Sequence, residues 1–151
     1  MARLRFDVDE LQKRPRVSDA APLVYIGMAA DIIHHGHINV IKTGALYGKV
    51  VLGLLTDEAI MSYKRKPVVP WEKRKLVAEH LKGISLVIPQ DSLDYRPNLM
   101  ALKPQFVVHG SDWKTGPQAE TRQQVIDTLG IWGGSLVEPE YTKGISTTYL
   151  I

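Results

Sequence analysis

The chain has 151 residues, 44% of them hydrophobic, a size that fits one globular domain rather than two. It contains no cysteine, which excludes disulfide bonds and thiolate metal sites, and no apolar run approaches the ~18 residues of a membrane-spanning helix. The formal net charge of +3 keeps an anionic ligand in view, but the basic runs at 64–66 and 73–75 are short and lack interleaved aromatic residues, which argues against nucleic-acid binding. Because residues 1–22 carry arginines but no apolar signal-peptide core, we expect a soluble cytoplasmic protein.

Residues 1–21 are charged and interrupted by proline, and we expect an N-terminal arm there, ahead of a single domain over 22–151. Within the domain, apolar runs rich in β-branched residues alternate with segments of helical periodicity. In chain order, the pattern predicts a strand at 23–28, a helix at 37–48, a strand at 49–55, helices at about 57–63 and at 71–83, a strand at 84–88, a helix at 94–102, a strand at 105–110, a helix at 118–134 and a strand at 135–141.

Strands separated by helical segments are typical of βαβ units, whose strands run parallel. The expected fold class is therefore α/β, a Rossmann-like three-layer sandwich with a five-stranded parallel sheet. In such sheets, ligands bind beyond the carboxyl ends of the strands, near the point where the strand order reverses. Four segments rich in His, Lys, Asp, Ser and Thr fall there, so we expect a polar crevice of phosphate size formed by DIIHHGH (31–37), YKRKP (63–67), HGSDW (109–113) and YTKGISTT (141–148).

Three of the five histidines lie in the first of these segments, which raises three alternatives: a metal site, an acid/base pair or a phosphate site. A metal site is disfavoured because no Glu or Asp lies between His34 and His37 and no Cys lies anywhere. His34 and His37 are three apart, so they share a face on the first turn of a helix, and Gly36 lets a ligand approach the backbone. The helix N-terminus favours an anion, so the segment indicates a phosphate site. The structural alternative is one core histidine and two exposed ones.

Three motifs carry a family resemblance. MAADIIHHGH resembles the HxGH signature of the cytidylyltransferase branch of the nucleotidyltransferases, YTKGISTT is similar to that family's RTxGISTS-type motif, and the proline loop with Arg74 resembles its ER-containing segment. More narrowly, the segments YKRKP, DYRPNL, KPQFVVHGSDWKTGPQ, TRQQVIDTL and WGG resemble the cytidylyltransferase domain fused ahead of phosphoenolpyruvate mutase in phosphonate pathways, including fosfomycin biosynthesis. On this resemblance, we expect the domain to come from a longer bifunctional chain with a covalently linked mutase domain.

The resemblance implies transfer of CMP from CTP to a phosphonate acceptor, with 2-hydroxyethylphosphonate as the best candidate and pyrophosphate as the leaving group. Two alternatives within the same reaction are 2-aminoethylphosphonate and an alcohol phosphate of the glycerol 3-phosphate or phosphocholine type. An alternative of another class is a non-catalytic nucleotide-binding regulatory domain. We expect Mg²⁺ as the cofactor, carried by the triphosphate rather than by a protein metal site, and a homodimer that binds neither nucleic acid nor membrane.

The resemblance also assigns residues. The catalytic residues are expected to be His34, His37 and Lys64. The acceptor is assigned to Asp31, Lys64, Arg74 and Arg122. The nucleotide is assigned to Met28, Ala29, Ala30, Gly36, Lys42, His109, Gly110, Asp112, Thr142, Gly144, Ile145, Ser146 and Thr147.

This sequence departs from the family pattern at three positions. Tyr141 replaces the usual Arg of the last motif, Ala45 replaces a usual Lys, for which Lys42 is the candidate substitute, and Ser111 stands where many relatives have Asp. Structural roles are the alternative for several assignments: Asp31 as a helix cap, Asp112 as a turn residue, Arg122 as a helix-surface residue and Lys64 as part of a solvated basic run.

Overall fold

A parallel sheet is the centre of the computed structural model, which describes residues 21–140. The strand order is β3-β2-β1-β4-β5, so the direction of crossover reverses between β1 and β4. Every neighbouring pair is parallel, which confirms the predicted five-stranded sheet. The strands are β1 (Leu23–Met28), β2 (Lys49–Leu55), β3 (Ile84–Gln90), β4 (Phe106–Val108) and β5 (Ser135–Val137).

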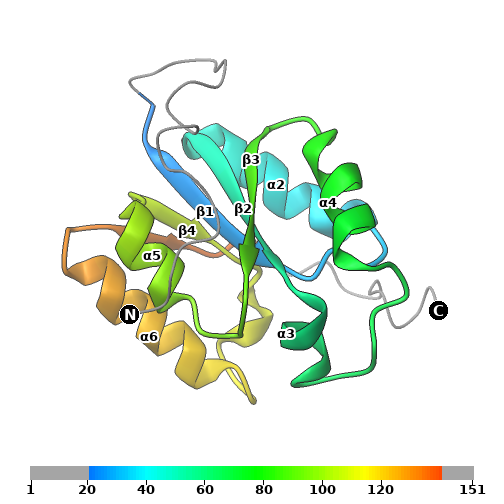
Figure 1. Ribbon diagram of the computed structural model, residues 1–151. Helices are drawn as coiled ribbons and strands as arrows, with labels where there is room; N and C mark the ends of the chain where they lie inside the picture. The colour runs from blue at the N-terminus through cyan, green and yellow to red at the C-terminus, as the bar shows by residue number, and fades with distance from the viewer. Residues whose placement is uncertain (1–20, 141–151) are drawn as a thin grey trace.

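Helices cover both faces of the sheet, as a three-layer Rossmann-like fold requires (Figure 1). One face carries α2 (His35–Tyr47) and α4 (Trp71–Glu79), and the other carries α5 (Arg96–Leu102) and α6 (Ala119–Gly130). The short helix α3 (Asp57–Met61) follows β2, and a 3-10 turn, η1 (Ser111–Trp113), follows β4. No helix within residues 21–140 is long and apolar enough to cross a bilayer.

Several predicted helices are shorter in the structure, for local reasons. The helix expected at 94–102 begins at Arg96, because the Asp94 side chain accepts the Arg96 backbone N–H at 2.9 Å and so ends the preceding turn. The helices expected at 71–83 and 118–134 end earlier, before Gly83 and Gly133, which adopt φ of +94° and +75°. A left-handed residue cannot continue a right-handed helix, so the chain turns there.

Alternation along the strands separates two apolar cores. Val24 and Ile26 of β1 face the cluster shared with α2 and α4, whereas Tyr25 between them faces the cluster shared with α5 and α6. All three side chains are at most 1% exposed. Because both faces of β1 and β2 are buried, these strands read as nearly continuous apolar runs, and their bounds match the prediction, whereas β4 and β5 are shorter than predicted.

Two paired glycines make room for aromatic side chains on the α5 and α6 face. Gly27 and Gly53 are direct register partners across β1 and β2. A Cβ atom on Gly53 would overlap the Tyr25 hydroxyl, and one on Gly27 would lie 2.7 Å from the Tyr95 hydroxyl. The two tyrosine rings meet edge to face, with centroids 5.7 Å apart, and they occupy the space that side chains would fill.

Gly53→Ala should therefore lower the free energy of unfolding by about 1–3 kcal/mol, because the added methyl group must displace the buried Tyr25 ring. Urea denaturation followed by circular dichroism measures this change. Gly130→Ala is the matched control, since a Cβ at Gly130 meets nothing within 4 Å, and stability should stay the same or rise slightly. Equal stability of the two variants would contradict this account of the paired glycines.

Candidate functional site

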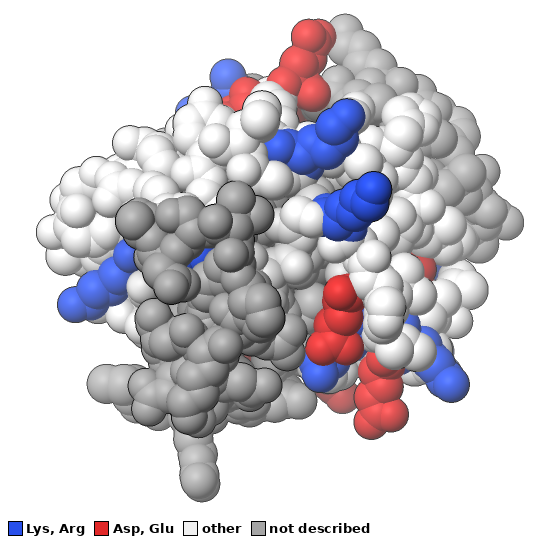
Figure 2. Space-filling view, turned by 90° about the horizontal axis from the view of Figure 1, so that it is seen from above, with Lys and Arg blue, Asp and Glu red and all other residues white. Residues whose placement is uncertain are grey.

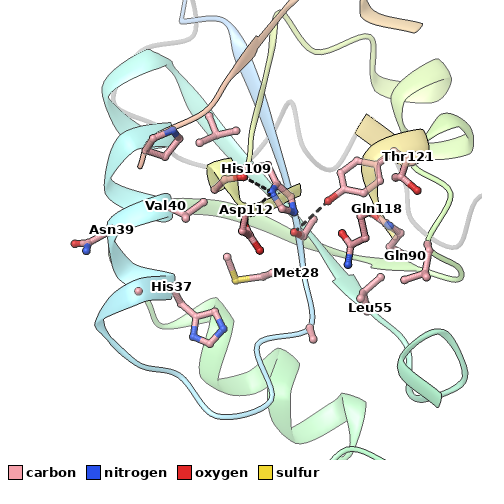
Figure 3. A pocket seen from close by; sticks show the side chains of 18 of the residues that line it. Met28, His37, Asn39, Val40, Leu55, Gln90, His109, Asp112, Gln118 and Thr121 are labelled. Atoms are coloured by element: carbon pink, nitrogen blue, oxygen red, sulfur yellow. Dashed lines mark hydrogen bonds and ion pairs between the residues drawn. The ribbon is translucent and has the colours of Figure 1, made fainter. Parts of the chain in front are cut away.

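A pocket of about 310 Å³ opens at the carboxyl end of the sheet, where the strand order reverses (Figure 3). This is the place that the sequence predicted. Nine of the residues assigned from the sequence line it: Met28, Ala29, His34, Gly36, His37, Lys64, His109, Gly110 and Asp112.

The first turn of α2 closes through two imidazole rings. His34 is the N-cap residue, and its Nδ1 accepts the Gly36 backbone N–H at 3.1 Å. His37 reaches back, and its Nδ1 accepts the His34 backbone N–H at 3.2 Å. The pair forms a capping box made of histidines, with the ring centroids 4.0 Å apart.

This capping fixes the chemistry of both rings. An Nδ1 atom that accepts a hydrogen bond carries no proton, so each neutral ring holds its proton on Nε2. His34 and His37 therefore present two Nε2–H donors at the N-terminus of a 13-residue helix, whose partial positive charge adds to them. Such an arrangement suits an anion and leaves no free basic nitrogen for proton abstraction.

The surroundings keep the imidazoles neutral. Burial, together with smaller effects of the nearby His34 and Lys64, lowers the pKa of His37 to about 4. Burial, followed by the charge of His35, also holds the pKa of His34 below its usual range. Burial and the neighbouring Arg65 lower the pKa of the Lys64 ammonium group. Lys64 lines the pocket beside the histidines and supplies the cationic side chain there.

Asp31 holds the loop that carries Lys64. Its carboxylate is 4% exposed and accepts the backbone N–H groups of Val68 and Val69, each at 2.9 Å, and Arg65 at 3.1 Å. Burial acts to raise the pKa of Asp31, but these hydrogen bonds outweigh it and leave the pKa below its usual range. Asp31, which the sequence assigns to the acceptor, has its oxygens engaged by the loop and does not line the pocket.

Arg74, which the sequence also assigns to the acceptor, is bonded within the protein and does not line the pocket. It is 2% exposed, and four of its N–H groups are used within the protein. They donate to the carbonyl oxygens of Ala29, Leu55 and Val69, each at 2.8 Å, and to the Asp57 carboxylate at 2.6 Å. Arg74 thereby ties the end of β1 to the end of β2 and to the basic loop.

Arg122, the third residue that the sequence assigns to the acceptor in this way, is paired with a carboxylate. Its guanidinium donates two hydrogen bonds to Glu138, at 2.9 and 3.0 Å, and it does not line the pocket. Arg122 and the Trp113 indole N–H together hold the pKa of Glu138 below its usual range. Trp113 stacks on His109 with centroids 3.6 Å apart, so this ion pair supports the wall of the pocket rather than the acceptor.

His109 has the opposite tautomer to the α2 histidines. Its Nδ1 lies 2.7 Å from the Gly110 carbonyl oxygen, so Nδ1 must donate, and the neutral ring leaves Nε2 as an acceptor. Burial lowers its pKa, against the opposing effects of the Gly110 carbonyl, Asp112 and Glu138. The pocket thus contains both donor and acceptor imidazole nitrogens.

Two further assignments fall outside the pocket. Lys42 lies on α2 with its side chain exposed, and Ala30 is 3% exposed at the turn after β1, where its φ is 49°. Neither Lys42 nor Ala30 lines the cavity. The assignments in the last motif lie outside the described residues: Thr142, Gly144, Ile145, Ser146 and Thr147.

The sequence analysis missed several lining residues. They include Gln90 at the end of β3, Tyr95 before α5, and Gln118 and Thr121 at the start of α6. The available signal was weak: a polar residue that ends an apolar strand, and polar residues in the first turn of the helix after HGSDW.

On the face shown in Figure 2, acidic and basic side chains are interspersed.

Comparisons with known proteins agree with this architecture. Residues 25–151 match the protein family described as Cytidylyltransferase-like. The chain is 29% identical over 136 residues to the bifunctional protein HldE of Gluconobacter oxydans (strain 621H). This match covers 87% of this chain and 27% of HldE. It is 30% identical over 125 residues to the ethanolamine-phosphate cytidylyltransferase of Mus musculus, which covers 80% of this chain and 30% of that protein. The chain thus spans less than a third of the length of these two relatives.

A solved structure shows the same fold. The lipopolysaccharide core biosynthesis protein from Thermoplasma volcanium GSS1 superposes with a TM-score of 0.66 over 82% of this chain and 98% of that chain. Its sequence identity is 19%, so the likeness concerns the fold alone.

The capping histidines predict a pH dependence of stability. His37 binds a proton near pH 6.5 in the unfolded chain but near pH 4 in the folded one, so stability is full above pH 6.5 and falls as the pH drops toward 4. His37→Gln keeps an acceptor for the His34 N–H and should remove up to about 3 kcal/mol of this loss. Urea denaturation at pH 7 and pH 4.5 measures it, and ¹⁵N NMR should show an Nε2-protonated ring. An Nδ1-protonated His37, or titration near pH 6.5 in the folded protein, would contradict the assignment.

Proposed function

Because the chain belongs to the cytidylyltransferase-like family, we propose that it transfers the cytidylyl group of CTP to an anionic oxygen of a small phosphonate or phosphate acceptor. The observation that carries the proposal is the pair of Nε2–H donors on His34 and His37, placed at a helix N-terminus inside the pocket. This arrangement supports the binding of a triphosphate and the stabilisation of charge that develops at its α-phosphorus.

The chemistry asks for positioning more than for proton transfer. An acceptor oxygen attacks the α-phosphorus, the bond from that phosphorus to the oxygen that bridges to the β-phosphorus breaks, and pyrophosphate leaves with the electron pair. The acceptor is already ionised near neutral pH, so no general base is needed. Neutral histidines whose Nδ1 atoms are occupied fit this requirement, because they can donate to phosphate oxygens but cannot accept a proton without breaking the cap.

Lys64 is proposed to bridge the acceptor and the α-phosphate, since it lines the same cavity as the histidines. Within residues 21–140, no three His, Cys, Asp or Glu side chains are grouped to hold a metal ion. We therefore propose that Mg²⁺ enters with the triphosphate, whose oxygens supply ligands of the kind that Mg²⁺ prefers.

For the acceptor, we propose 2-hydroxyethylphosphonate, on the sequence resemblance to the phosphonate-pathway domains. The relative from Mus musculus is named for ethanolamine phosphate, so alcohol phosphates and 2-aminoethylphosphonate belong in the same assay. The non-catalytic alternative is nucleotide binding without reaction, and release of pyrophosphate separates the two.

The purified chain should release pyrophosphate from CTP and Mg²⁺ only when an acceptor is present, and ATP serves as the control nucleotide. His34→Asn should lower kcat by about 10²-fold or more, because Asn caps the helix but has no group in the place of the imidazole Nε2–H. His35→Gln is the matched control on the exposed position beside it and should change kcat little. A folded His34→Asn variant with normal turnover would contradict the histidine role. CTP binding without pyrophosphate release, with every acceptor, would favour the non-catalytic alternative.

A further inference from the structure

One side of the pocket lies opposite the α2 histidines and is built differently. Figure 3 places Gln90, Gln118 and Thr121 there, across the cavity from His37. We propose that these three side chains form a subsite that reads the uncharged tail of the acceptor, beyond its anionic head. This inference rests on the proposed transfer reaction, whose phosphate chemistry lies at the α2 side.

Gln90 is held in one orientation from behind. It is 2% exposed, and its Oε1 accepts the Tyr25 hydroxyl at 2.5 Å, while that hydroxyl in turn accepts from Asn98 at 3.0 Å. Burial raises the pKa of Tyr25, so the phenol keeps its proton and donates. The amide group is therefore fixed with Nε2 directed to the Ser92 carbonyl at 2.9 Å.

This orientation leaves one hydrogen on the Gln90 Nε2 without a partner among residues 21–140. Gln90 lines the cavity, so a bound molecule can accept that hydrogen. A buried donor left unpaired is destabilising, which favours a ligand that supplies an acceptor atom.

Gln118 and Thr121 also turn polar groups to the cavity. Gln118 occupies the N-cap position of α6 but makes no capping hydrogen bond through its side chain. Thr43 and Thr128 donate their hydroxyl groups to the carbonyl four residues earlier, at 2.9 and 2.7 Å, whereas Thr121 has no such bond. Both Gln118 and Thr121 line the pocket, and neither side chain has a partner among the described residues.

The groups on this side are uncharged, which indicates the class of tail. An ammonium group would need a carboxylate or a set of acceptors to replace its water. Two carboxylates line the pocket: Asp112 lies by His109, between the two sides, and Glu140 is an exposed residue that follows β5, so neither belongs to the Gln90, Gln118 and Thr121 side. Amide and hydroxyl groups instead suit a tail that bears hydroxyl groups, since each can both donate and accept.

The test uses pairs of acceptors that differ only at the end of the tail: 2-hydroxyethylphosphonate against 2-aminoethylphosphonate, and 2-hydroxyethyl phosphate against ethanolamine phosphate. Wild type should favour the hydroxyl member of each pair by about 10-fold or more in kcat/KM. Gln118→Glu, which is isosteric and adds a charge, should shift that ratio toward the amine by about 10-fold or more and leave the KM of CTP unchanged. Thr121→Val should lower kcat/KM for the hydroxyl acceptors without changing the KM of CTP.

Gln123→Glu is the matched control, because it adds the same charge to an exposed position of the same helix, and its ratio should equal that of wild type. Circular dichroism of each variant checks the fold. Equal discrimination by wild type, Gln118→Glu and Gln123→Glu, with normal turnover, would overturn the subsite and leave the transfer reaction standing. Absence of pyrophosphate release by wild type with all four acceptors would overturn both.

Discussion

The site depends on one local interaction, the capping of α2 by two histidines. The Nδ1 atoms of His34 and His37 each accept a backbone N–H at the start of the helix. The same two bonds set the helix N-terminus and the tautomer, so each ring carries its donor hydrogen on Nε2. Burial keeps His37 neutral, with a pKa of about 4, so the donors persist at physiological pH. The two Nδ1 atoms therefore determine both where α2 begins and which nitrogen of each imidazole ring is the donor.

Around that turn, two charged side chains act as scaffold. Asp31 draws in the backbone of the basic loop at Val68 and Val69, and Arg74 joins this loop to the ends of β1 and β2. Together they hold the basic loop that carries Lys64. Lys64 lines the pocket, whereas Asp31 and Arg74 do not. Because both Asp31 and Arg74 are buried, removing either side chain would leave its hydrogen-bond partners unpaired in a region of low polarity.

The sequence predicts the sheet well because strands buried on both faces leave a continuous apolar signal, and it predicts the histidine motif because its geometry is local. The sequence misleads where the rotation of a helix about its axis decides which side chains are buried. Arg74 lies in the basic run at 73–75 and is assigned to the acceptor from the sequence, yet the turn of α4 directs it inward while Lys73 stays exposed. The lining positions Gln90 and Gln118 come from separate elements, β3 and α6, and only the closed sheet brings them to one cavity. The spacing of these two residues along the chain therefore does not predict that they line one cavity.

We propose that the triphosphate of CTP binds the Nε2–H groups of the α2 histidines. A crystal structure with a non-hydrolysable CTP analogue and Mg²⁺ should show phosphate oxygens at about 2.7–3.2 Å from Nε2 of both His34 and His37, with both Nδ1 caps retained. A triphosphate bound elsewhere in the pocket, or histidine rings flipped so that Nδ1 faces the phosphates, would contradict it.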